Sequence, residues 1–211
     1  MDKNDYRNTT YCKKLTEVEK KKKELEKKIR NNGHPRTNNF YEIVRDEYKR
    51  EYLDIYNYKC SYCGVLVFVP GYQSFEIDHF KNKASFDTDT AAGAMENLVL
   101  ACFTCNRSKS SLELSENYIN ELQPDKNKIK NYFYRDNDYS IKIVDKYKSD
   151  KEIEKFHKTL KLNYEFRKID FLLLNMEGLY ENLNEGPLKD KIGNLKGILY
   201  NKRSLIHTTR E

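Results

Sequence analysis

The sequence predicts an α+β protein in which a small cysteine-bearing core is flanked by helical regions on both sides. The middle of the chain holds short β-branched and aromatic runs bounded by turn residues, whereas the flanks repeat apolar residues at three- and four-residue steps. A chain of 211 residues can bury one core, and its 17 Tyr and 10 Phe supply apolar bulk that disordered chains lack. We expect an N-terminal helical region at 1–57, a core at 58–111 and a mostly helical region at 112–211.

Two helices are expected in the N-terminal region. Thr16 followed three residues later by Glu19 has the form of a capping box, which predicts a helix over about 17–30. The run Lys20–Lys23 is then a solvated face of this helix. Apolar residues at helical steps predict a second helix over about 39–57.

The core should consist of short strands around a long loop. Strands are expected at 65–69, 75–77 and 98–101, because these runs are β-branched, aromatic or alternating. The polar stretch 81–96 between the last two indicates a loop. A short helix should follow the last cysteine, over about 106–111.

The C-terminal region should be mostly helical. Two β-prone runs separated by Asp and Asn predict a hairpin near 132–143. A second capping box begins at Ser149, so we expect helices over about 150–162 and 164–183. Gly and Pro then interrupt the pattern, and a weaker helical segment starts at 188.

Composition and charge limit the possible functions. The longest apolar runs, 65–69 and 171–174, are too short to cross a bilayer, and residues 1–5 lack the apolar core of a signal peptide. We therefore expect a cytoplasmic protein with reduced thiols and no membrane partner. The net charge is +6, but residues 60–111 hold four Lys or Arg against five Asp or Glu, a net of −1. A polyanion would need metal charge or basic flanks to bind there.

Two Cys-x-x-Cys pairs suggest a structural zinc site. Four thiolates, from Cys60, Cys63, Cys102 and Cys105, can surround a tetrahedral Zn²⁺, which would contribute folding energy but leave no open coordination position. Two alternatives are compatible with the same four residues, namely unrelated buried cysteines and a redox-active pair. Cys12 stands alone and is interpreted as a packing residue.

Between and after these pairs lie Asp78-His79, Asn97 and Asn106-Arg107-Ser-Lys109. This combination over about residues 58–111 resembles the HNH endonucleases, which have a ββα-metal core. The resemblance implies that His79 is the general base, that Asp78 and Asn106 hold a catalytic Mg²⁺ or Mn²⁺, and that Asn97 holds the loop carrying the base. Three features depart from the family pattern: Asn106 stands in place of His, no Pro soon follows His79, and the loop holds one Gly.

Elementary chemistry agrees with these roles. A neutral imidazole can take a proton from water, and carboxylate and amide oxygens suit Mg²⁺. His79 could equally be a metal ligand by its chemistry alone. Adjacent strand residues point to opposite faces, so Asp78 and His79 can share one site only if the strand ends or twists there. Glu76 is interpreted as a strand-surface residue.

Four cations near the motif are candidate nucleic-acid contacts: Arg107, Lys109, Lys81 and Lys83. For Arg107 and Lys109 the competing interpretation is a solvent-facing charge.

Taken together, these features predict a metal-dependent endonuclease that hydrolyses DNA. Leu160-Lys-Leu-Asn163 followed by Arg167 is also similar to the HNH subunits of Septu-type bacterial anti-phage systems, which implies an ATPase partner. The alternative function is a non-catalytic zinc-ribbon module that binds nucleic acid or protein.

Overall fold

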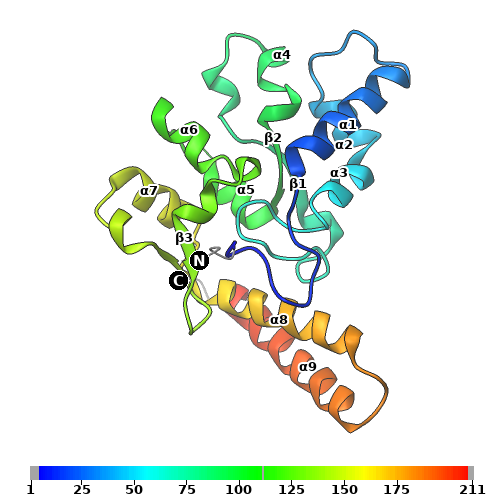
Figure 1. Cartoon of the computed structure of the whole chain (residues 1–211), viewed down its shortest axis with the longest axis vertical. Coiled ribbons are helices and arrows are strands. Elements are labelled where there is room, and N and C mark those ends of the chain that lie inside the picture. The colour runs from blue at the N-terminus through cyan, green and yellow to red at the C-terminus, as the bar shows by residue number, and fades with distance from the viewer. Residues whose placement is uncertain (1–4, 111, 209–211) are drawn as a thin grey trace.

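The computed structural model describes residues 5–110 and 112–208, so residues 1–4, 111 and 209–211 of the predicted regions lie outside the described part. It confirms the α+β class (Figure 1). The α-helices and β-strands are α1 Val18–Asn31, α2 Tyr41–Asp46, α3 Lys49–Ile55, β1 Phe75–His79, α4 Asp89–Ala92, β2 Leu98–Cys102, α5 Phe103–Lys109, α6 Glu116–Leu122, β3 Phe133–Arg135, β4 Ile141–Ile143, α7 Lys151–Thr159, α8 Glu165–Asn182 and α9 Pro187–Thr208.

A ββα unit lies at the centre of the molecule. β1 and β2 pair antiparallel, with Phe75 opposite Cys102 and His79 opposite Leu98. α5 begins at the residue after β2 and packs against both strands. All five residues of β2 are buried, so this strand lies inside the core. The segment between the strands contains α4 and leaves the sheet at the end where His79 lies (Figure 1).

The N-terminal helices cover one side of this unit (Figure 1). α1 turns Val18, Lys22, Leu25 and Ile29 inward, a spacing of helical steps that places them on one face. Lys22 is tolerated there because its ammonium donates to the Asp125 carboxylate at 2.7 Å and to the Leu98 carbonyl at 2.6 Å. This buried pair ties α1 to β2 and to the segment after α6.

The C-terminal half adds a small hairpin and a helical pair. β3 pairs with β4 in the segment where the sequence indicated a hairpin. α8 and α9 lie side by side and project away from the centre of the molecule (Figure 1). Among the described residues, none of the helices combines the length and the apolar character that crossing a bilayer requires.

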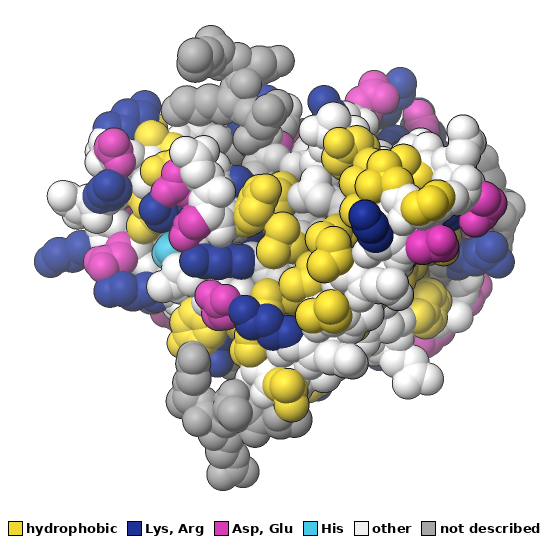
Figure 2. Space-filling view, turned by 90° about the horizontal axis from the view of Figure 1, so that it is seen from below, with side chains coloured by type: hydrophobic (Ala, Val, Ile, Leu, Met, Phe, Trp, Pro, Cys, Tyr) yellow, Lys and Arg dark blue, Asp and Glu magenta, His cyan; other side chains and the backbone are white. Residues whose placement is uncertain are grey.

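Surface charges of both signs are mixed. On the face shown in Figure 2, Lys and Arg side chains are interspersed with Asp and Glu and with hydrophobic groups, and they do not form one basic area. Many Lys and Arg side chains of the described residues pair with a nearby carboxylate, as Lys168 does with Asp138 at 2.9 Å.

Two expected elements differ from the structure. The segment 65–69 is not a strand, because the chain turns back after the first cysteine pair and only Leu66 makes a bridge, to Lys59. Val65 and Val67 are nevertheless buried, without belonging to a sheet. The helix expected over 39–57 is divided into α2 and α3, and the backbone leaves the helical region at Tyr48 (φ −119°, ψ 18°).

Several helix ends also differ. α1 is preceded by Glu17 at φ 54°, with no side-chain cap, so the expected capping box at Thr16 is wrong. α7 is capped by Asp150, whose carboxylate accepts from two backbone N–H groups, rather than by Ser149. α5 begins at Phe103, before the second cysteine of its pair, and α6 was not expected.

Candidate active site

The four paired cysteines form one buried cluster. Their sulfur atoms all lie within 4.8 Å of one another, and Cys63 Sγ is 3.9 Å from Cys102 Sγ. A Zn–S bond of about 2.3 Å gives sulfur–sulfur edges of about 3.8 Å in a tetrahedron, so the cluster fits Zn²⁺. It closes the base of the β1–β2 unit, because one pair precedes β1 and the other spans the junction of β2 and α5.

Gly64 lets the first cysteine pair turn tightly. It has φ 76°, a conformation that L side chains rarely adopt, and a Cβ there would lie 2.6 Å from the Arg7 carbonyl oxygen. The N-terminal segment therefore crosses directly over this turn. Arg7 also donates to the Ser61 carbonyl at 2.6 Å.

One face of β1 meets α5. Glu76 and Asp78 are two residues apart on the strand and so share a face. On α5, Asn106 and Lys109 are one turn apart and share the opposing face. Asn106 Nδ2 donates to Glu76 Oε2 at 2.5 Å, and Lys109 Nζ lies 3.3 Å from Asp78 Oδ1.

Asp78 is the more deeply buried of the two carboxylates. The Tyr62 hydroxyl donates to its Oδ2 at 2.7 Å, and its other oxygen faces Lys109. Burial raises the pKa of Asp78, while Lys109 and the Tyr62 hydrogen bond act in the opposite direction. The Lys109 ammonium also donates to the carbonyls of His79 and Phe80, at 2.8 and 3.3 Å, and so holds the end of β1.

His79 lies on the other face of β1, toward α2. Its ring stacks on Tyr41, with centroids 4.5 Å apart and planes 29° apart. Burial lowers the pKa of His79, and Lys83 and Lys109 lower it further, so the imidazole is neutral at pH 7. Among the described residues, no hydrogen bond joins its ring to Asp78 or Asn106.

Asn97 fastens the loop that follows His79. Its Oδ1 accepts from the Lys81 N–H at 2.9 Å, and its Nδ2 donates to the carbonyls of Lys81 and Ala92, at 3.2 and 2.8 Å. The Phe80 N–H donates to the Asn97 carbonyl at 2.7 Å. These bonds connect the two ends of the segment between β1 and β2.

Comparison with known protein families matches residues 60–112 to the HNH endonuclease family. Residues 60–112 are therefore similar to an HNH endonuclease domain, and this segment is called the HNH domain. No curated protein and no solved structure matched the chain. The family match confirms the resemblance inferred from the motif, and it supports nuclease activity and nucleic-acid binding.

The four predicted nucleic-acid contacts occupy different positions around the HNH domain. Arg107 is exposed, lies 3.6 Å from Glu76 and covers the Phe103 ring. Lys81 and Lys83 lie at the surface and pair with Glu116 and Asp89. Lys109, however, is 3% exposed and engaged with Asp78, so in this structure it faces the interior rather than a phosphate.

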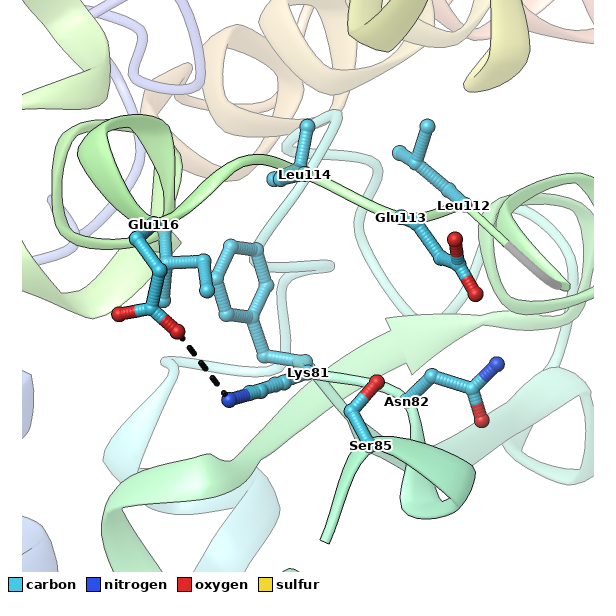
Figure 3. Close-up of a pocket in the computed structure, with 9 residues that line it drawn as sticks. Lys81, Asn82, Ser85, Leu112, Glu113, Leu114 and Glu116 are labelled. Atoms are coloured by element: carbon cyan, nitrogen blue, oxygen red, sulfur yellow. Dashed lines mark ion pairs between the residues drawn. The ribbon is translucent and has the colours of Figure 1, made fainter.

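A pocket of about 340 Å³ lies beside the HNH motif (Figure 3). It is lined by the chain just after His79, including Lys81 and Asn82, and by the segment after α5 up to Ile119. The Lys81–Glu116 ion pair, 3.7 Å long, spans it. Asp78, His79 and Asn106 do not line this pocket, so the candidate active site lies next to it.

Three residues at the site gained importance only from the structure. Glu76 orients the Asn106 amide instead of being a plain strand-surface residue. Tyr62, inside the first cysteine pair, holds Asp78. Tyr41 is a stacking partner of His79 from outside the domain. Strand alternation placed Glu76 on the face of Asp78, and this was the one signal in the sequence that pointed to its position.

Proposed function

We propose that the protein is a metal-dependent endonuclease that hydrolyses phosphodiester bonds of DNA at its HNH domain. The observation that carries the proposal is the pairing of β1 with α5. This pairing places Glu76 and Asp78, on one face of β1, against Asn106 and Lys109 of α5, while His79 ends the same strand on its other face. Such a set of groups is not needed by a module that only binds nucleic acid.

Each residue has a distinct proposed role. His79 accepts a proton from the attacking water, and Tyr41 keeps its ring in one orientation. Asp78 and Asn106 would hold a Mg²⁺ or Mn²⁺, and their oxygen donors fit such ions. The Asn106 atom that bonds the Glu76 carboxylate must be the donor nitrogen Nδ2. The amide oxygen Oδ1 is then the atom available to the cation. When bound, the cation would neutralise charge on the scissile phosphate.

The cations around the site have separate proposed roles. Arg107 and the loop lysines Lys81 and Lys83 contact the nucleic-acid backbone, because their charges lie at the surface. Lys109 instead positions Asp78 and the end of β1. Asn97 holds the loop that follows His79 and carries Lys81.

The proposed biological setting is bacterial anti-phage defence with an ATPase partner. Its support is the similarity of Leu160–Asn163 and Arg167 to Septu-type HNH subunits. Cleavage assays run with and without a Septu-type ATPase test this setting separately from the chemistry. A rate that the ATPase leaves unchanged would remove the partner from the proposal.

The test of the activity is cleavage of DNA and RNA with Mg²⁺, Mn²⁺ or EDTA, comparing the zinc-loaded parent with His79→Ala. Losing a general base costs roughly 10²–10⁴-fold in rate. The matched control is His34→Ala, because the His34 ring is partly exposed and its ion-pair partner among the described residues is Glu47. Equal cutting by the parent and His79→Ala would refute the assigned base, and DNA binding without metal-dependent cutting would favour the zinc-ribbon alternative.

A further inference from the structure

A buried arginine from the C-terminal region reaches into the cysteine cluster. Arg167 lies near the start of α8 and is 1% exposed. Its Nη1 lies 2.8 Å from Cys63 Sγ and 3.8 Å from Cys102 Sγ, and its Nη2 lies 3.0 Å from Cys105 Sγ. One guanidinium therefore contacts three of the four candidate zinc ligands.

The backbone around Arg167 holds the guanidinium in place. Nη2 also donates to the Leu160 carbonyl at 3.2 Å, and Nε donates to the Lys161 carbonyl at 3.4 Å. The Arg167 carbonyl in turn accepts from Arg135 at 3.2 Å, and Arg135 also reaches the Cys63 carbonyl. The α7–α8 turn and the β3–β4 hairpin thus meet at the first cysteine pair.

Charge explains why an arginine is stable in this position. Arginine stays protonated in proteins, and burying a charge without a counter-charge is costly. In the described part of the chain, Arg167 makes no carboxylate ion pair, and Asp170 one turn away pairs with Arg203 instead. Four thiolates around one Zn²⁺ carry a net charge of −2. A zinc-loaded cluster would therefore supply the counter-charge for the Arg167 guanidinium.

We propose that Arg167 is an outer-sphere residue of the zinc site, whose hydrogen bonds to sulfur stabilise the thiolate–zinc cluster and fasten α8 to the HNH domain. Groups that hydrogen-bond to metal ligands typically change metal affinity 10–100-fold. Because binding equilibria are coupled reciprocally, zinc also stabilises the docking of α8. The proposal concerns the zinc site and does not depend on the nuclease activity.

The test measures zinc affinity by chelator competition for the full chain and three variants. Arg167→Gln removes the charge and is expected to weaken zinc binding 10–100-fold. Arg167→Lys keeps the charge but loses the fork that reaches three sulfurs, so an intermediate loss is expected. The matched control is Lys168→Gln, which removes the neighbouring cation of α8 from its surface pair with Asp138 and should leave zinc affinity unchanged.

A spectroscopic readout separates contact with sulfur from general packing. With Co²⁺ in place of Zn²⁺, the sulfur-to-metal charge-transfer band of Arg167→Gln should shift relative to the parent, while that of Lys168→Gln should not. Parent-like zinc affinity together with a parent-like band in Arg167→Gln would overturn the proposal. If Arg167→Gln does not fold, Arg167→Lys decides by the same two measurements.

Discussion

Lys109 and Arg107 provide a direct test of how the candidate site is held together. Both are cations of α5, and each faces a carboxylate of β1 at a similar distance, 3.3 Å for Lys109–Asp78 and 3.6 Å for Arg107–Glu76. They differ in exposure, since the Lys109 side chain is 4% exposed and the Arg107 side chain is 67% exposed. Substituting each with Met therefore compares a buried with an exposed ion pair on the same two elements.

The expected magnitudes differ by several kcal/mol. Removing one partner of a buried pair leaves an uncompensated charge and costs about 3–5 kcal/mol. Lys109→Met also removes the donor to the His79 and Phe80 carbonyls, which places it at the upper end of that range. Arg107→Met removes an exposed pair, which contributes at most about 1 kcal/mol.

The assay is urea unfolding of zinc-saturated protein at pH 7. Adding Asp78→Asn to Lys109→Met should recover much of the lost stability, because no charge is then left buried. Since Asp78 becomes neutral as the pH falls through its raised pKa, the deficit of Lys109→Met should also shrink from pH 7 toward pH 4. Similar free energies of unfolding for Lys109→Met and Arg107→Met would refute this description of the site.

Three further predictions concern the neighbours of this pair. Because burial lowers the pKa of His79, an NMR titration of its ring should have a midpoint below the ordinary value of about 6.5, and a higher midpoint would contradict the assignment. Tyr62→Phe should lower the free energy of unfolding by about 1.5–3 kcal/mol, since it removes a hydrogen bond to the buried Asp78 carboxylate. Tyr132→Phe is the control and should lower it by less than about 1 kcal/mol, because the Tyr132 hydroxyl donates to the more exposed Glu121 carboxylate. Asn97→Ala removes three hydrogen bonds and should speed amide exchange over 81–92, whereas unchanged exchange there would argue against its role as a loop brace.

The central unit could be predicted from the sequence because its signals are local. The two Cys-x-x-Cys pairs predicted a single cluster, and the structure forms it. Short β-prone runs on either side of a polar stretch predicted β1 and β2, although the run at 65–69 has the same composition and is not a strand. The composition of this run indicates burial, but the chain turns after the first cysteine pair and only Leu66 makes a bridge, to Lys59.

The contacts that complete the site have no local signal. Lys109 reaches Asp78 across 31 positions, and Arg167 reaches Cys63 across 104. A lysine or an arginine on a helix usually lies at the surface, so only the three-dimensional arrangement identifies these two as buried. The same holds for Tyr41, which belongs to a helix that precedes the HNH domain.

In the proposed site, Asp78 of β1 and Asn106 of α5 bind one divalent cation at the end of the strand that carries His79. The most direct measurement is anomalous scattering from Mn²⁺ in crystals of the zinc-loaded protein. A manganese peak bonded to a carboxylate oxygen of Asp78 and to Oδ1 of Asn106 is the predicted result. A peak elsewhere, or binding that is unchanged in Asp78→Ala, would contradict the claim.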